Sequence, residues 1–283
     1  MRRPFTAAAV QLCASADRDS NLERARALVH AAAAAGAELV ALPEVFAWRG
    51  PKDQEIAHAE PITGPTVRWM RALARELRIH LVGGSFLERA GRDARAFNTS
   101  LVIGPSGRVL AAYRKIHLFD VDLPGQAPIR ESATRKPGRS VVVARTPLAT
   151  LGLSVCYDLR FPELYRRLVV AGAEVLLVPS AFTETTGRDH WETLLRSRAI
   201  ENQCFVIAPD QVGRGPTGSC WGHSTIVDPW GRILAVAPDG DGFASAALDP
   251  AELERVRRVL PALRHARLSP AKGAGSCGRP TNR

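Results

Sequence analysis

Short apolar runs alternate with amphipathic segments along most of the chain. Apolar, β-branched runs predict strands near residues 5–13, 38–42, 80–87, 97–103, 109–115, 151–156, 174–179 and 205–209. Helical periodicity predicts helices near residues 20–36, 67–78, 163–171, 190–203 and 250–260. A capping box formed by Ser20 and Glu23 is expected to begin the helix at residues 20–36. This alternation is typical of a layered α/β fold.

Two stretches depart from this pattern. Residues 116–140 are rich in Pro and Gly, and a loop of this length without its own elements is usually functional or disordered. From about residue 269 the chain has no apolar periodicity and carries basic residues but no acid. We therefore expect one domain over residues 1–268 and a disordered basic tail over residues 269–283.

The charge of the chain does not indicate a nucleic-acid partner. The formal net charge is +10, but five Lys or Arg residues and no acid lie from Arg264 onwards, so half of the excess falls near the end of the chain. The other basic residues are scattered among acids, and no nucleic-acid-binding motif is present. The apolar runs are too short to span a bilayer, and the N-terminal residues show no cleavable leader. We expect no nucleic-acid and no membrane partner.

The cysteines favour a reducing compartment. The chain has five of them, widely spaced and without a C-x-x-C pair, which argues against both a disulfide framework and a zinc site. The seven histidines are dispersed as well. We therefore expect a cytoplasmic protein that holds no metal.

Three residues that carry chemistry lie at or just beyond the ends of predicted strands. Cys156 is followed by a predicted helix, whose free N–H groups favour a thiolate and can bind an oxyanion. Glu44 lies where open α/β sheets place their ligands and suits proton transfer. Lys115 is one of only four lysines, and its compact ammonium can approach a single oxyanion closely. Taken one by one, these residues could equally be an inert cysteine, a loop glutamate and a strand-end cation.

Taken together, the segments around these residues resemble the Glu–Lys–Cys motifs of the carbon–nitrogen hydrolases, the nitrilase superfamily. Glu44 lies in LPEVF, Lys115 in YRKIHLFD and Cys156 in GLSVCYDLRFPE, in the order of that family. Further similarity over residues 197–203 and 221–231 extends the resemblance from Phe5 to about Leu268. Several long motifs in the right order outweigh the separate structural interpretations.

The resemblance implies an α/β fold of a specific kind, a four-layer α–β–β–α sandwich that usually dimerises. It also implies hydrolysis of a nonpeptide C–N bond without metal or cofactor. Cys156 would be the nucleophile that forms a thioester, and Glu44 the proton-transfer residue. Lys115 and the backbone N–H of Tyr157 would hold the oxyanion, and Glu131 would support the lysine.

Residues near the nucleophile narrow the resemblance to one branch. Cysteine followed by Tyr-Asp resembles the amidase branches, and residues 120–126, 180–187 and 190–192 look like the Nit group. That group contains deaminated glutathione amidase and omega-amidase. In it, Arg160 matches a binder of the substrate carboxylate, and Phe182 and Thr186 match other pocket residues. Arg160 could instead form a helix-cap ion pair with Glu163 or Asp158.

The sequence thus predicts a cofactor-free amidase for a small carboxylate-bearing amide, acting as a homodimer or higher homo-oligomer. The substrate would resemble deaminated glutathione or the ω-amide of a keto acid. Two alternatives within the enzyme class are an N-carbamoyl amino acid hydrolase, which would release CO₂ with ammonia, and an aliphatic amidase. A catalytically idle binding protein on the same fold is the alternative outside that class.

Overall fold

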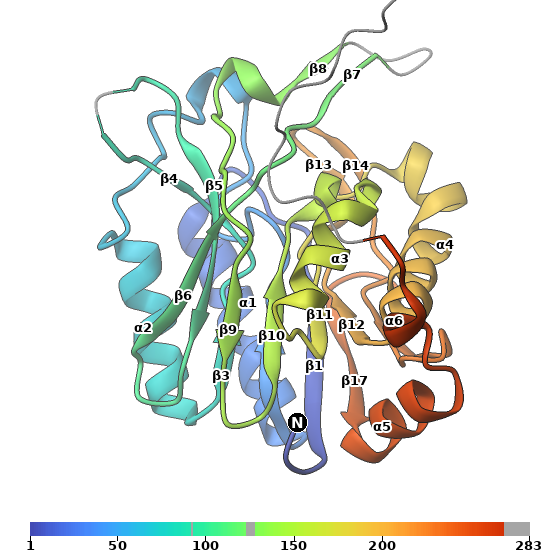
Figure 1. Cartoon of the computed structure of the whole chain (residues 1–283). Helices are drawn as coiled ribbons and strands as arrows, with labels where there is room; N and C mark the ends of the chain where they lie inside the picture. Colours follow the sequence, from blue (N-terminus) through green and yellow to red (C-terminus); the bar gives the residue numbers. More distant parts are fainter. Residues whose placement is uncertain (92, 123–127, 269–283) are drawn as a thin grey trace, which may run out of the picture.

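Two β-sheets lie face to face between two layers of helices (Figure 1). The structure is a computed structural model that describes residues 1–91, 93–122 and 128–268. The first sheet has the order β17-β1-β2-β3-β5-β4, with β6 beside β5, and β1, β2 and β3 run parallel. Its strands are β1 (Phe5–Gln11), β2 (Ala37–Ala41), β3 (His80–Val82), β4 (Phe86–Glu88), β5 (Phe97–Ile103), β6 (Val109–Arg114) and β17 (Gly242–Leu248).

The second sheet has the order β16-β15-β12-β11-β10-β9, and β10, β11 and β12 run parallel. Its strands are β9 (Val143–Arg145), β10 (Thr150–Leu153), β11 (Val175–Leu177), β12 (Phe205–Ala208), β15 (Thr225–Val227) and β16 (Ile233–Val236). Two short hairpins lie outside both sheets: β7 (Asp120–Val121) with β8 (Ile129–Arg130), and β13 (Val212–Gly215) with β14 (Gly218–Trp221).

The parallel strands at the centre of each sheet are buried on both faces, which explains why they are largely apolar runs. In β2, Leu39 and Ala41 belong to the core between the sheets, whereas Val40 packs in the core beneath the helices, because successive side chains point to opposite faces. Helices α1 (Arg18–Ala34) and α2 (Pro65–Leu77) cover the first sheet. Helices α3 (Pro162–Val170) and α4 (Glu184–Asn202) cover the second. The four-layer α–β–β–α prediction is confirmed.

Four local expectations were wrong. Helix α1 begins at Arg18 because the Asp17 side chain, not Ser20, caps it by accepting from the Ser20 N–H at 3.1 Å. The strand expected over residues 80–87 divides into β3 and β4 because Gly84 takes a φ of +46° between them. Helix α4 begins at Glu184, six residues before the expected start. Residues 116–140 are not a bare loop, since they contain β7, β8 and the 3₁₀ turn η2 (Glu131–Ala133).

The remaining helices lie near the C-terminal end: α5 (Pro250–Val259) and α6 (Ala262–His265). Among the described residues no helix is long and apolar enough to span a membrane. The tail predicted over residues 269–283 lies outside the described residues. The single domain, the homodimer and the cytoplasmic location stay predictions.

Gly84 tests the close contact between the loops that follow β2 and β3 of the first sheet. A Cβ on this residue would lie 1.9 Å from the carbonyl oxygen of Pro43, the residue before Glu44. We expect Gly84→Ala to lower the free energy of unfolding by about 1–3 kcal/mol more than Gly36→Ala, because of this backbone collision. Gly36 is a matched control, since its φ is +90° and a Cβ there would meet nothing within 4 Å. Urea unfolding of both variants measures the difference, and equal losses would contradict the collision.

Candidate active site

The four residues expected to carry the chemistry lie together at one cavity of about 400 Å³. Glu44 follows β2 and Lys115 follows β6, so both come from the first sheet. Cys156 follows β10 of the second sheet and begins the 3₁₀ turn η3 (Cys156–Arg160). Glu131 begins η2. The two facing sheets therefore supply the thiol from one side and the charged pair from the other.

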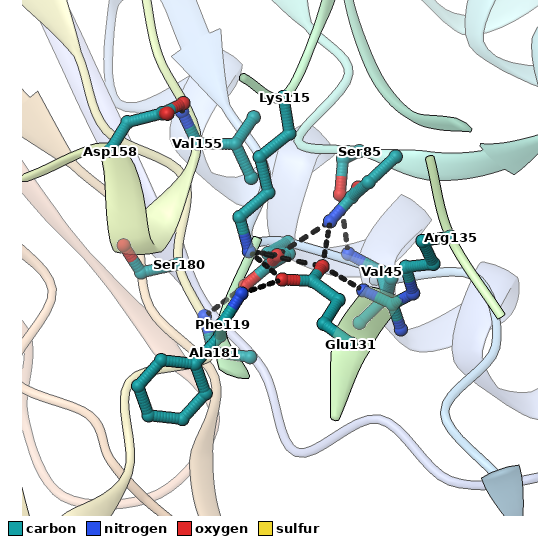
Figure 2. A network of polar contacts seen from close by, with 12 residues as sticks. Val45, Ser85, Lys115, Phe119, Glu131, Arg135, Val155, Asp158, Ser180 and Ala181 are labelled. Carbon is teal, nitrogen blue, oxygen red and sulfur yellow. Dashed lines mark hydrogen bonds and ion pairs between the residues drawn. The ribbon is translucent and has the colours of Figure 1, made fainter. Parts of the chain in front are cut away.

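Lys115 is buried between two carboxylates. Its Nζ lies 3.1 Å from Glu44 Oε1 and 2.9 Å from Glu131 Oε2, and the side chain is only 2% exposed. Figure 2 shows Lys115 directed toward Glu131, with Arg135 approaching the same carboxylate from the other side. Burial lowers the pKa of Lys115, but Glu131 and Glu44 outweigh it, so that the pKa lies above its ordinary range. Lys115 is therefore a permanent cation at the cavity.

Glu131 is held just as firmly as the lysine that it binds. Burial raises its pKa, but Lys115 and Arg135 outweigh burial and bring the pKa to about 2. The Glu131 carboxylate also accepts from the Phe119 N–H. Arg135 in turn pairs with Glu55 at 2.6 Å, which continues the line of alternating charges. The predicted supporting position of Glu131 beside Lys115 agrees with this geometry.

Both oxygens of Glu44 are fixed by hydrogen bonds. Oε1 accepts from Asn98 Nδ2 at 2.7 Å, and Oε2 accepts from the Ala181 N–H at 2.9 Å. Asn98 lies within β5 and also donates to Glu131 Oε1 at 3.4 Å. Its only sequence signal was an amide near the start of a predicted strand. These contacts hold the carboxylate in one orientation beside the Cys156 thiol.

The turn that presents Cys156 is strained and well anchored. Cys156 has a φ of +49°, a conformation that residues other than glycine rarely adopt. Asp158, which is fully buried, holds the turn by accepting from the Tyr113 hydroxyl at 2.7 Å and from the Val155 N–H at 2.9 Å. It also pairs with His117 Nδ1 at 2.7 Å. Sequence reasoning did not find this anchoring role of Asp158.

The protonation state of the Cys156 thiol differs from the thiolate that the sequence led us to expect. Burial and the neighbouring Glu44 raise the pKa of Cys156 well above its usual value, and they outweigh Lys115 and the Ala181 N–H, which act in the other direction. The free N–H groups of the following turn therefore do not produce a resting thiolate. The site holds a protonated thiol beside a fixed carboxylate that can take its proton.

Arg160, Phe182 and Thr186 line a second, smaller cavity together with Cys156. The Arg160 guanidinium lies 5.1 Å above the Phe182 ring and 3.2 Å from His190 Nδ1. Within the described part of the chain it forms no ion pair with Asp158 or Glu163, so the helix-cap alternative does not occur. The Arg160 guanidinium is thus available to bind an anion beside the Cys156 thiol.

Possible metal ligands do not gather among the described residues: nowhere do three His, Cys, Asp or Glu side chains form a group that could hold an ion. The carboxylates of the site are used otherwise. Glu44 and Glu131 bind Lys115, and Glu55 binds Arg135. The polar groups of the cavity therefore form an ion-pair network around a thiol.

This arrangement agrees with comparison to known proteins. Residues 6–258 match the family described as carbon-nitrogen hydrolase. The chain is a carbon–nitrogen hydrolase. It is 43% identical over 267 residues to the deaminated glutathione amidase of Synechocystis sp., with 93% of this chain and 98% of that protein covered. It is 40% identical over 266 residues to the omega-amidase NIT2 of Homo sapiens, with 93% and 95% covered.

A solved structure supports the same assignment. The structure of the C. elegans NitFhit protein matches this hydrolase with a TM-score of 0.87 at 37% identity, over 94% of this chain and 65% of that one. The recognised resemblance is confirmed: the carbon–nitrogen hydrolase belongs to the Nit branch and is an amidase that acts on small amides.

Glu131→Gln tests the ion-pair network of the hydrolase. Removing one buried partner should lower the free energy of unfolding at pH 7 by about 3–5 kcal/mol. The folded-state pKa of about 2 lies below the ordinary value of 4.5, so this stabilisation is fully present above about pH 5.5 and is lost as pH falls from 4.5 toward 2. The difference in the free energy of unfolding between wild type and Glu131→Gln should therefore decrease as the pH falls from 4.5 toward 2. Urea unfolding at several pH values measures it.

Glu76→Gln is a suitable control, because Glu76 forms an exposed ion pair with Arg26 at 2.6 Å. Its loss should cost below about 1 kcal/mol. A Glu131→Gln variant that behaves like this control at every pH would show that the network does not stabilise the fold.

Proposed function

We propose that this amidase hydrolyses small amides that carry a carboxylate, either deaminated-glutathione-like amides or the ω-amide of a keto acid, through a thioester on Cys156. The observation that carries the proposal is the position of the Cys156 thiol. It lies beside the Glu44–Lys115 pair and also lines a cavity with Arg160. The nucleophilic sulfur of Cys156 thus lies near a proton acceptor, a fixed cation and a residue that can bind an anion.

In the first step, Glu44 accepts the thiol proton while the sulfur attacks the amide carbonyl. The π electrons of the carbonyl move to its oxygen, and the resulting oxyanion is stabilised by Lys115 and the Tyr157 backbone N–H. The N–H of Tyr157 belongs to the first turn of η3, where N–H groups lack intrahelical acceptors. Because the pKa of Lys115 is raised, the ammonium donates a hydrogen bond without giving up its proton.

In the second step, the oxyanion collapses, the C–N bond breaks and Glu44 gives its proton to the departing nitrogen. Ammonia or an amine leaves, and an acyl thioester remains on Cys156. Glu44, again ionised, then takes a proton from water as the water attacks the thioester. This second oxyanion collapses, the C–S bond breaks, and Glu44 returns its proton to the sulfur, which releases the carboxylic acid and restores the thiol.

The names of the relatives and the position of Arg160 support an anionic substrate. A planar guanidinium binds a carboxylate through two parallel hydrogen bonds, and Arg160 has no carboxylate partner among the described residues. Phe182 and Thr186 would form the wall on which the acyl portion of the substrate packs.

The nucleophile is tested by Cys156→Ala. We expect turnover of such an amide to be abolished, since no other group could form the thioester, while the fold is retained. Cys204→Ala is a matched control, because Cys204 is also a buried thiol but lies in another part of the core. Its variant should keep most activity. Amine release and circular dichroism measure both properties, and residual turnover by Cys156→Ala would contradict the assignment.

The role of Arg160 is tested by paired substrates. Arg160→Ala should reduce kcat/KM for a carboxylate-bearing amide by about 30- to 1,000-fold, equivalent to about 2–4 kcal/mol, while its neutral counterpart loses little. Arg160→Lys should restore only part of the rate, because an ammonium cannot reproduce the guanidinium fork. Equal losses for both amides would show that Arg160 is structural.

A further inference from the structure

The space around Cys156 extends in two directions. The larger lobe is the cavity of about 400 Å³, and the smaller lobe is the one that Arg160 lines. Phe119, Cys156 and Ala181 line both lobes. The acid–base machinery lies on one side only: Glu44 and Lys115 line the larger lobe and not the smaller one.

This asymmetry orients the substrate, on the basis of the proposed mechanism. The leaving nitrogen must come within hydrogen-bond reach of Glu44, which protonates it. The amine portion of the amide therefore enters the larger lobe, and the acyl portion points toward Arg160. The smaller lobe holds about 10 Å³, room for about one water molecule, so binding of the acyl portion requires the partly exposed Arg160 side chain to move.

The larger lobe is far too large for ammonia alone. A water-sized molecule occupies about 30 Å³, whereas a lobe of about 400 Å³ is in the range of sites that bind whole small ligands. If ammonia were the usual leaving group, this space would have no occupant in the reaction. An amine portion of dipeptide size uses it.

The charges of the larger lobe indicate what that amine portion carries. Four cations and three carboxylates line it, which gives a net formal charge of +1; two of the cations, Lys115 and Arg135, form ion pairs with the three carboxylates, as described above. The other two cations are Arg49 and Lys52, and neither forms an ion pair with a carboxylate of the described residues. The lobe therefore has an uncompensated positive charge.

The two cations differ in their setting. Lys52 is partly exposed and donates to the backbone carbonyl of Arg130, a neutral partner. Arg49 is 8% exposed and donates to the Gly218 carbonyl at 3.0 Å, and its buried Nη1 has no hydrogen-bond partner among the residues that the structure describes. Lys52 can therefore turn toward a ligand, whereas Arg49 is a fixed charge in the wall.

We propose that the larger lobe binds an amine portion that bears a carboxylate, with Lys52 as the residue that contacts this carboxylate and determines specificity. Arg49 adds a fixed positive field. The substrate is then an amide with an acidic group on each side of the scissile bond: one faces Arg160 and the other faces Lys52. A peptide-like amide such as deaminated glutathione meets this requirement, and an ω-amide that releases ammonia does not.

Three amides test the proposal. They share a 2-oxo acid acyl portion and differ in the amine portion: a dipeptide with a free carboxylate, the same dipeptide as its carboxamide, and ammonia. The readout is the ratio of kcat/KM for the free dipeptide to that for the carboxamide. Loss of one charged contact should lower this ratio in Lys52→Met by about tenfold to a hundredfold, mainly through KM. Lys52→Glu should bring the ratio below one, and Lys52→Arg should preserve a preference.

Lys136→Met is the matched control. Lys136 also donates to a backbone carbonyl, that of Ala90 at 3.0 Å, but it lines a different cavity. Its variant has the same change in net charge and should keep the wild-type ratio. A wild-type ratio near one, or a ratio that Lys52→Met and Lys52→Glu leave unchanged, overturns this inference and leaves the proposed function standing. A wild-type protein that hydrolyses none of the three amides overturns the proposed function itself.

Discussion

A single ammonium group, buried between two carboxylates, is the constraint on which the rest of the site depends. An unpaired charge as enclosed as that of Lys115 would cost several kcal/mol, so its partners must be placed accurately. Glu44 and Glu131 neutralise it, and Asn98, Arg135 and the Ala181 N–H complete the hydrogen bonds of the two carboxylates. Each added partner comes from a different segment. The network therefore connects the ends of β2, β5 and β6 to η2. It holds the proton acceptor Glu44 in position as well as the cation Lys115.

The facing sheets bring the thiol to this network. Cys156 comes from the second sheet and the Lys115 pair from the first, so the reacting groups meet only when the two sheets pack. Asp158 joins the two halves, because it anchors the cysteine turn and accepts from Tyr113 of β6. The strained backbone of Cys156 is held by a buried carboxylate rather than by glycine. Packing of the two sheets therefore also orients the nucleophile.

The alternating apolar pattern predicted a layered α/β fold, because strands that are buried on both faces are continuous apolar runs, whereas the order of the four layers came from the motif resemblance. Motif resemblance led to Glu44, Lys115 and Cys156, which the structure brings together. Asn98 and Arg135 were missed, since a polar residue in a strand or a loop arginine has no local sign of a distant carboxylate. The cap of α1 was misplaced because Asp17 competes with Ser20. The protonated state of Cys156 depends on burial and on Glu44, which only the folded chain brings together.

The raised pKa of the Cys156 thiol also has a consequence for chemical damage. Peroxides, disulfides and alkylating reagents attack the thiolate, and their rate follows its fraction and its exposure. Cys156 is 8% exposed and protonated at rest, so such reagents meet little reactive sulfur. Attack on an amide differs, because the carbonyl arrives where Glu44 removes the proton and Lys115 receives the charge. Activation of the sulfur is thus coupled to the arrival of an electrophile that fits beside both groups.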